Sequence, residues 1–134
     1  MSLLCIAGAG VTVRIAATVF TLAWTHTIEK VPWEEDWRIE GHRLMLTQSR
    51  IKGSGAGMEP PPDARLEDGF YRWAPADPYR TEVILRRAPV EIAGDWRLCV
   101  DGACRRLGEI VPVEADPVRL SVCPDDATDG LRSP

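Results

Sequence analysis

The sequence has no long apolar run and no excess of basic residues, and these two absences exclude several classes of protein. The uncharged stretches on either side of Arg14 are each too short to span a bilayer as a helix. The net charge is -4, with acidic and basic side chains mixed along the 134 residues. Nucleic acids and anionic membrane surfaces attract proteins with a basic field, which this chain lacks. We therefore expect neither as a partner.

The N-terminal residues also lack the order of a secretory signal, which needs positive charge near its start and an apolar run after it. The first basic residue is Arg14. We expect a soluble protein with no clear signal peptide or transmembrane helix, and we favour a cytoplasmic over a periplasmic location. Cys5 and Cys123 lie in apolar, strand-like runs and are expected to be buried thiols.

Helical periodicity is absent, whereas turn signals recur about every 8–12 residues, as in a sandwich or barrel. The fold class is therefore all-β. We expect a single-domain antiparallel β-sandwich or barrel of about ten short strands, with at most one short helical turn, and we favour the sandwich. Residues 1–123 form the domain and the polar residues 124–134 a flexible tail. The expected strands are 3–6, 11–15, 19–28, 35–40, 43–51, 70–73, 82–87, 94–100, 103–107 and 118–123.

A long irregular segment, 52–69, contains the run GSGAG. Such lengths are uncommon in compact domains, and we expect an ordered loop packed over one end of the sheet. Glycines can direct backbone N–H groups at an anion, so Gly55, Gly57 and Lys52 are candidates for binding a small anionic solute. The P-loop pattern and the G-x-S-x-G pattern of serine hydrolases are both missing. The alternative is a loop whose glycines only adopt positive φ.

Residues 20–37 combine a regular strand with a dense cluster of acids and tryptophans. Alternation places Trp24 and His26 on the apolar face, so His26 is either a core-edge histidine or a general base or ligand. Reversal of the chain at 30–33 would bring Glu35 back toward His26. We expect His26, Glu29 and Glu35 to lie together near Gly55 and Gly57, unless these groups only satisfy one another and pin the loop.

Metal-ligand spacings such as HExxH are absent, and we expect no metal and no cofactor. Trp24 and Trp96 are expected in the core, whereas Trp33, beside a proline in a polar loop, is the candidate for an exposed contact.

The strongest hairpin signal is Asp101-Gly102, a two-residue type I′ turn. Cys99 and Cys104 then face each other as a non-hydrogen-bonded pair about 4.5 Å apart at Cα, close enough for a disulfide. An oxidised bridge would favour an exported protein.

Three motifs, FTLAWTHTIEKVPWEEDWRIE, KGSGAGMEPP and DWRLCVDGAC, give the chain a resemblance to the bacterial domain-of-unknown-function family DUF1850. The family pattern of Phe-Thr-Leu, His-Ser-Val-Glu and Glu-Glu corresponds to residues 20–22, 26–29 and 34–35, with conservative departures at Thr27 and Ile28. Its Gly-Ala-Gly motif corresponds to residues 55–57.

Because members of this family occur beside fused permeases of TAXI-type TRAP transporters, the resemblance implies an accessory role in solute uptake. The implied partners are a TRAP permease or a solute-binding component. Some members begin with a membrane anchor, which this sequence lacks. Our leading hypothesis is an accessory or ligand-binding β-domain with no catalytic residues. The alternatives are a small hydrolase or metal-dependent enzyme using His26 with Glu29 or Glu35, and a purely structural protein-interaction domain.

Overall fold

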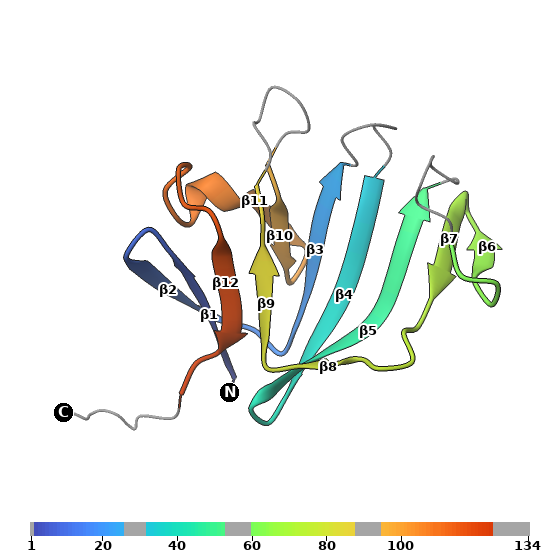
Figure 1. The fold of residues 1–134 in the computed structure, drawn as a ribbon, viewed down its shortest axis with the longest axis horizontal. Helices are drawn as coiled ribbons and strands as arrows, with labels where there is room; N and C mark the ends of the chain where they lie inside the picture. Colours follow the sequence, from blue (N-terminus) through green and yellow to red (C-terminus); the bar gives the residue numbers. More distant parts are fainter. Residues whose placement is uncertain (1, 26–31, 53–59, 88–94, 125–134) are drawn as a thin grey trace.

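The computed structural model describes residues 2–25, 32–52, 60–87 and 95–124, and these residues are almost entirely β (Figure 1). The elements are β1 (Leu3–Gly8), β2 (Val11–Ala16), β3 (Val19–Thr25), β4 (Pro32–Glu40), β5 (Arg43–Lys52), β6 (Arg65–Glu67), β7 (Phe70–Trp73), β8 (Tyr79–Arg80), β9 (Glu82–Leu85), β10 (Arg97–Val100), β11 (Ala103–Arg106), the 3₁₀ helix η1 (Leu107–Glu109) and β12 (Val118–Val122).

The strands form two antiparallel sheets, so the predicted all-β sandwich-like fold is confirmed. The smaller sheet has the order β2-β1-β12-β9, and the larger has the order β11-β10-β3-β4-β5-β7-β6, with β8 pairing with β5. The structure adds two strands that the alternation did not predict, β6 and β8. Both are only two or three residues long, too short to show a period of two.

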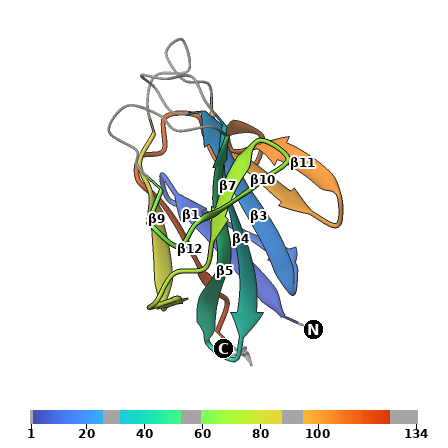
Figure 2. The same ribbon diagram turned by 90° about the vertical axis from the view of Figure 1, so that its right-hand side faces the viewer.

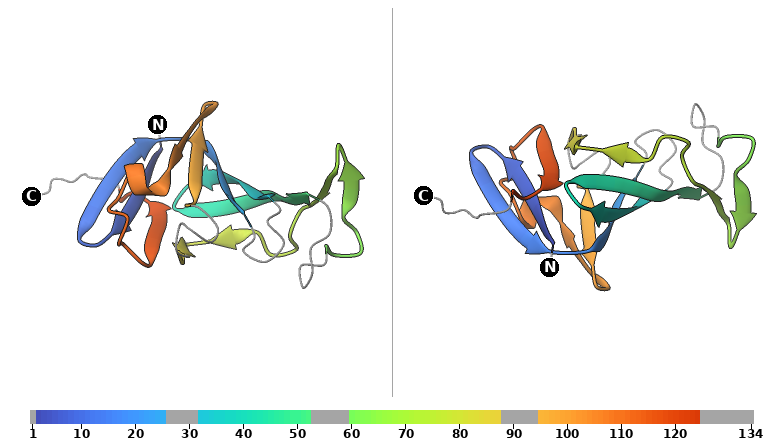
Figure 3. Two further views of the ribbon diagram at one scale, coloured as in Figure 1. Left: turned by 90° about the horizontal axis from the view of Figure 1, so that it is seen from above. Right: turned by 90° about the horizontal axis from the view of Figure 1, so that it is seen from below.

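The core lies where the smaller sheet covers the larger one. Its side chains come from β1, β9 and β12 on one side and from β3, β4, β5 and β10 on the other, joined by η1 and the segment after it. Figures 1 and 3 show that β7 and β6 extend beyond this covered region. Figure 2 shows the β10–β11 hairpin projecting on one side of the larger sheet and β9 lying on the other. Part of the larger sheet is therefore left without a covering sheet.

The two ends of the described chain are joined by a disulfide between Cys5 and Cys123, so the prediction of two free buried thiols is wrong. Strand β1 pairs with β12, and Cys5 lies opposite Ser121. Cys123 comes two residues later and shares that face, with the two Cα atoms 5.0 Å apart. Both cysteines are buried, as expected. Their pairing was missed because it joins strands 118 residues apart.

The β10–β11 hairpin has the predicted register. Asp101 and Gly102 have φ values of 52° and 81°, as a type I′ turn requires. Cys99 lies opposite Cys104 and forms the expected disulfide, with the Cα atoms 4.0 Å apart.

A buried ion pair links the chain just after β9 to the chain just before β10. Arg87 Nη2 lies 2.9 Å from Asp95 Oδ2, and both side chains are only 7% exposed. The Asp95 carboxylate also accepts hydrogen bonds from the backbone N–H groups of Trp96, at 2.9 Å, and Gly108, at 2.6 Å. Arg87 Nη1 donates to the carbonyl oxygens of Pro112 and Ala115. This cluster, the Asp95 clamp, fixes the backbone of Trp96 against the sandwich.

Candidate functional site

Strand β4 presents different chemistry on its two faces. Its buried positions, Trp37 and Ile39, alternate with the exposed or half-exposed Arg38 and Glu40. The same alternation places Trp33 and Glu35 inward and places Glu34 and Asp36 outward. Two candidate sites follow, one on each face of the larger sheet.

On the outward face, Arg50 of β5 holds two acidic side chains of β4. Arg50 Nε lies 2.6 Å from Glu34 Oε1, and Nη1 lies 2.6 Å from Asp36 Oδ2. Thr21 Oγ1 donates to the other oxygen of Asp36 at 2.8 Å. Burial alone would lower the pKa of Arg50, but its hydrogen bonds to Asp36 and Glu34 outweigh burial and raise it. In this part of the outward face one cation therefore holds two anions, so the network keeps one negative charge.

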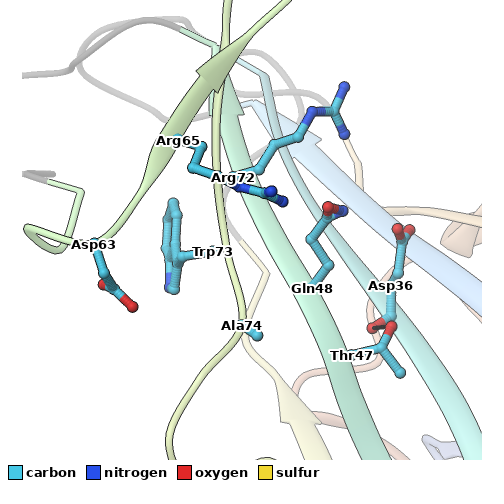
Figure 4. Close-up of a pocket in the computed structure, with 8 residues that line it drawn as sticks. All are labelled: Asp36, Thr47, Gln48, Asp63, Arg65, Arg72, Trp73 and Ala74. Carbon is cyan, nitrogen blue, oxygen red and sulfur yellow. Dashed lines mark hydrogen bonds between the residues drawn. The ribbon is translucent and has the colours of Figure 1, made fainter.

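Beside this network lies a pocket of about 500 Å³, which we call the arginine pocket (Figure 4). Figure 4 shows Arg65 of β6 and Arg72 of β7 next to each other, with one guanidinium close to Gln48 of β5 and the other pointing away from Gln48 and Asp36. The lining residues are Asp36, Thr47, Gln48, Asp63, Arg65, Arg72, Trp73 and Ala74. A β-bulge in the β4–β5 ladder shifts the register between Asp36 and Trp37, so Thr47 has no opposite residue and lies in the lining.

Several polar groups of the arginine pocket are poorly satisfied. Arg72 is 22% exposed, and its nearest acidic partner, Glu67, lies 3.5 Å away at 50% exposure. Arg65 is 4.0 Å from the same carboxylate. Such loose, exposed pairs contribute little, about 0–1 kcal/mol. Within the described residues, the buried Nε of Arg72 has no hydrogen-bond partner and Gln48 makes no side-chain hydrogen bond. Donors are therefore available to a ligand here.

A second hollow of about 520 Å³ lies on the other side of Asp36 and Thr47, toward the β10–β11 hairpin. Its charged lining residues are Asp36 and Asp101, and no arginine lines it. The lining of this hollow therefore offers no positively charged side chain that could bind an anion.

On the inward face, four tryptophans form a row across the larger sheet. The ring centroids are 4.4 Å apart for Trp96 and Trp24, 5.2 Å for Trp24 and Trp33, and 5.8 Å for Trp33 and Trp73. All four side chains are half-buried. The predicted inward direction of Trp24 and Trp96 is right, but neither is fully buried, and Trp96 packs against the core from its edge. The buried tryptophan is Trp37, at 4% exposure.

Next to this row, a cleft of about 280 Å³ lies between β4 and β9, and we call it the Glu35 cleft. Its lining residues are Glu35, Trp37, Leu46, Arg80, Glu82, Val83, Ile84, Leu85 and Trp96. Glu35 pairs in register with Leu22 and Ser49, which are 0% and 4% exposed. Burial raises the pKa of Glu35 above its ordinary value of 4.5. A hydrogen bond from Trp37 Nε1, at 3.2 Å, the nearby indole of Trp33 and the positive charge of Arg80 work in the opposite direction but do not outweigh burial.

The structure brings together some of the predicted site residues and separates others. Trp33 and Glu35 share the inward face of β4. Trp33 is half-buried, and its Nε1 atom is fully enclosed, so it is not the exposed contact that was predicted. Lys52 is exposed at the end of β5, where its Nζ lies 5.8 Å from the Phe70 ring, and the alternation of β5 places it on the outward face. Lys52 and Glu35 therefore do not form one site.

His26, Glu29, Gly55 and Gly57 lie outside the described residues, and their convergence stays a prediction. The described strand ends on either side of them do lie next to one another. Thr25 pairs with Pro32, and Trp33 pairs with Ile51, one residue before the end of β5.

Sequence reasoning missed Arg65, Arg72 and Gln48. Arg65 lies on β6, inside a segment that was expected to be one long loop. A signal for this hairpin was present, because Asp68-Gly69 is the same dipeptide type as Asp101-Gly102 and also adopts positive φ, 54° and 82°. An Asp-Gly turn between the strand-like runs at residues 65–67 and 70–73 predicts the β6–β7 hairpin.

The described residues contain no group of three or more His, Cys, Asp or Glu side chains that could hold a metal ion. In the same parts of the chain, no helix has the length and apolar character needed to cross a membrane. Comparison with protein families gives one match, over residues 20–107, to a domain of unknown function, DUF1850. No curated protein and no solved structure matches the chain.

Proposed function

Because the chain belongs to the DUF1850 family, whose function is not established, we propose from its own geometry that it binds a small anionic solute in the arginine pocket. We further propose that this binding serves a TRAP-type solute transporter. The transport link is supported by the resemblance of the motifs described above. The anionic solute is supported by the pocket, and the observation that carries it is the pair of under-used arginines, Arg65 and Arg72.

The chemistry of the lining favours a carboxylate. A guanidinium presents a planar fork of N–H groups that matches the two oxygens of a carboxylate, and such bidentate pairs are the stronger kind of hydrogen bond. Arg72 is the better placed of the two, because it is 22% exposed whereas Arg65 is 73% exposed. Gln48 can donate a further, uncharged hydrogen bond. A volume of about 500 Å³ is within the usual range of small-molecule pockets.

The acidic side chains in the lining limit the charge of the solute. Asp36 shares the single positive charge of Arg50 with Glu34, and Asp63 makes no side-chain hydrogen bond or ion pair within the described residues. A solute with several negative charges would be repelled by Asp63, whereas a hydroxyl or amino group could donate to it. A monocarboxylate with one such group, for example a hydroxy acid, is therefore the best fit.

The disulfides favour an oxidising compartment for this activity. All four cysteines are paired, in Cys5–Cys123 and Cys99–Cys104. Structural disulfides persist in exported and periplasmic proteins and are rare in the reducing cytosol. We therefore propose an exported location in place of the cytoplasmic one favoured by the sequence.

Calorimetric titration of the full chain with lactate, succinate and inorganic phosphate tests the anion site. We expect saturable binding of lactate, weaker binding of succinate, and a loss of at least about ten-fold in lactate affinity in Arg72→Gln. The matched control is Arg105→Gln, because Arg105 is exposed on β11, away from the pocket. Equal lactate affinity in wild type and Arg72→Gln, or no binding of any of the three anions, would contradict the anion site.

The transport link has its own test. Co-purification of the full chain with a TAXI-type TRAP permease from the same genome is expected, and it should persist in Arg72→Gln. Failure to co-purify under conditions that keep the permease folded would contradict the accessory role, and it would leave the proposal of an anion site unaffected.

A further inference from the structure

We propose that the Glu35 cleft is a second binding site, and that it takes a small organic ammonium ion. This inference goes beyond the anion site, because it concerns the opposite face of β4 and a ligand of the opposite charge. It rests on different residues, so either proposal can fail without the other.

The Glu35 carboxylate is half-buried and has no cation in contact with it. It lies on the inward face of β4 between Trp33 and Trp37, opposite the fully buried Leu22. Its side-chain hydrogen bond comes from Trp37 Nε1, at 3.2 Å, a neutral donor. Within the described residues, no lysine or arginine nitrogen lies within 4.0 Å of it. A partly desolvated carboxylate without a cation in contact is costly, so it marks a place where a cation would be favoured.

The other charged groups that face the cleft have hydrogen-bond or ion-pair partners of their own. Arg80 Nη1 donates to the backbone carbonyls of Asp77 and Tyr79, both at 2.8 Å, so its guanidinium is held at its own strand and its charge acts on Glu35 only from beyond contact distance. Glu82 is paired with Arg119 at 3.0 Å. Among the charged residues lining the cleft, Glu35 is the one whose charge is not balanced at contact distance.

The walls of the cleft suit an alkylammonium ion. Trp37 and Trp96 line it, and Trp24 continues the aromatic surface beyond Trp96. Indole rings attract cations through their faces, and more strongly where the cation is desolvated. Leu46 and Val83 provide apolar contacts for alkyl groups. A volume of about 280 Å³ is at the lower end for ligand pockets and admits an ion of a few carbon atoms.

A purely structural role for Glu35 would make a different prediction. A structural carboxylate is saturated with donors, as Asp95 is by Arg87 and two backbone N–H groups. Glu35 has one neutral donor instead. Its removal should therefore abolish cation binding without weakening the fold.

The test is a titration of the full chain with butylammonium chloride and with tetramethylammonium chloride at constant ionic strength, followed by tryptophan fluorescence and calorimetry. We expect saturable binding with a change in fluorescence, since Trp96 and Trp37 line the cleft. In Glu35→Gln the affinity should fall by at least about ten-fold. The matched control is Glu114→Gln, which removes the same charge from an exposed position and should bind as wild type does.

A second variant keeps the test decisive if Glu35→Gln does not fold. Val83→Phe on β9 narrows the cleft without altering the carboxylate, and it should also abolish binding. Wild-type affinity in both variants, or no saturable binding of either ammonium ion to the wild type, would overturn the proposal. Lactate binding in the arginine pocket should be unchanged in Glu35→Gln and Val83→Phe, which separates this failure from failure of the anion site.

Discussion

Asp95 has a buried carboxylate and Glu35 a half-buried one, and the two differ in the donors that surround them. Asp95 is 7% exposed and has an ion pair with Arg87 and hydrogen bonds from the backbone N–H groups of Trp96 and Gly108. Glu35 has Trp37 Nε1 as its side-chain donor, and burial raises its pKa. The difference shows how a binding group can be told from a structural one. A saturated buried carboxylate holds the fold, whereas an unsaturated one in a cleft is available to a ligand.

The largest expected effect is the loss of the Asp95 clamp. Asp95→Asn keeps the shape of the side chain but removes its charge, which leaves Arg87 buried without a counter-ion. We expect the free energy of unfolding to fall by about 3–5 kcal/mol, the usual cost of breaking a buried pair from one side. Urea denaturation followed by fluorescence measures it. A cost below about 1 kcal/mol would show that the clamp is not structural.

Removal of Arg50 tests the outward face of the same sheet. Arg50→Met leaves Glu34 and Asp36 without the cation that separates their charges. Because these side chains are 15–33% exposed, we expect a smaller loss, about 1–3 kcal/mol. Urea denaturation measures it, and the control is Arg105→Met, for which we expect no change. A loss below about 0.5 kcal/mol would contradict a structural role for this network.

Glu35→Gln is the counterpart of Asp95→Asn and should have the opposite sign. Replacing a half-buried carboxylate that has no cation in contact by an amide removes the cost of desolvating its charge. We therefore expect the free energy of unfolding to rise by about 1 kcal/mol at neutral pH. The same denaturation experiment measures it, with Glu114→Gln as the control. Destabilisation of the size expected for Asp95→Asn would mean that Glu35 is a structural residue.

The pH dependence of that difference follows from the sign of the pKa shift. In the folded protein Glu35 holds its proton more tightly than in the unfolded chain, where its pKa is near 4.5. Its contribution to stability is therefore lost as the pH rises from below 4.5 through the folded-state pKa. The advantage of Glu35→Gln over wild type should be smallest below pH 4.5 and should level off above the folded-state pKa. A constant difference across this range would contradict the raised pKa.

The smallest expected effect on stability is that of Arg72→Gln. Its ion pair with Glu67 is long and half-exposed, so the free energy of unfolding should change by less than about 0.5 kcal/mol. Lactate affinity should nevertheless fall. A loss of stability comparable to that in Arg50→Met would place Arg72 in the scaffold.

The sequence predicted the parts of this fold that local patterns determine. Strands β3, β4, β5 and β10 show a period of two, and the Asp101-Gly102 turn fixed the Cys99–Cys104 register. The Cys5–Cys123 disulfide could not be predicted this way, because it depends on pairing the first strand with the last. Glu35 and Trp33 were singled out for their position in the cluster, and a binding role for them stays a prediction. Arg65 was missed because β6 is three residues long and was expected to be loop. Arg72 lies on the predicted strand 70–73, but without β6 beside that strand nothing indicated a pocket there.

We propose that the half-buried carboxylate of Glu35 binds an organic cation, and the most direct test is to titrate the Glu35 carboxyl group. Carbon-13 NMR of the Glu35 side-chain carboxyl, assigned by comparison with Glu35→Gln, gives its pKa with and without butylammonium. We expect a pKa above 4.5 in the free protein and a fall toward or below that value when butylammonium is added, because the cation favours the charged form. A pKa at or below 4.5 in the free protein, or one that butylammonium leaves unchanged, would contradict a cation site at Glu35.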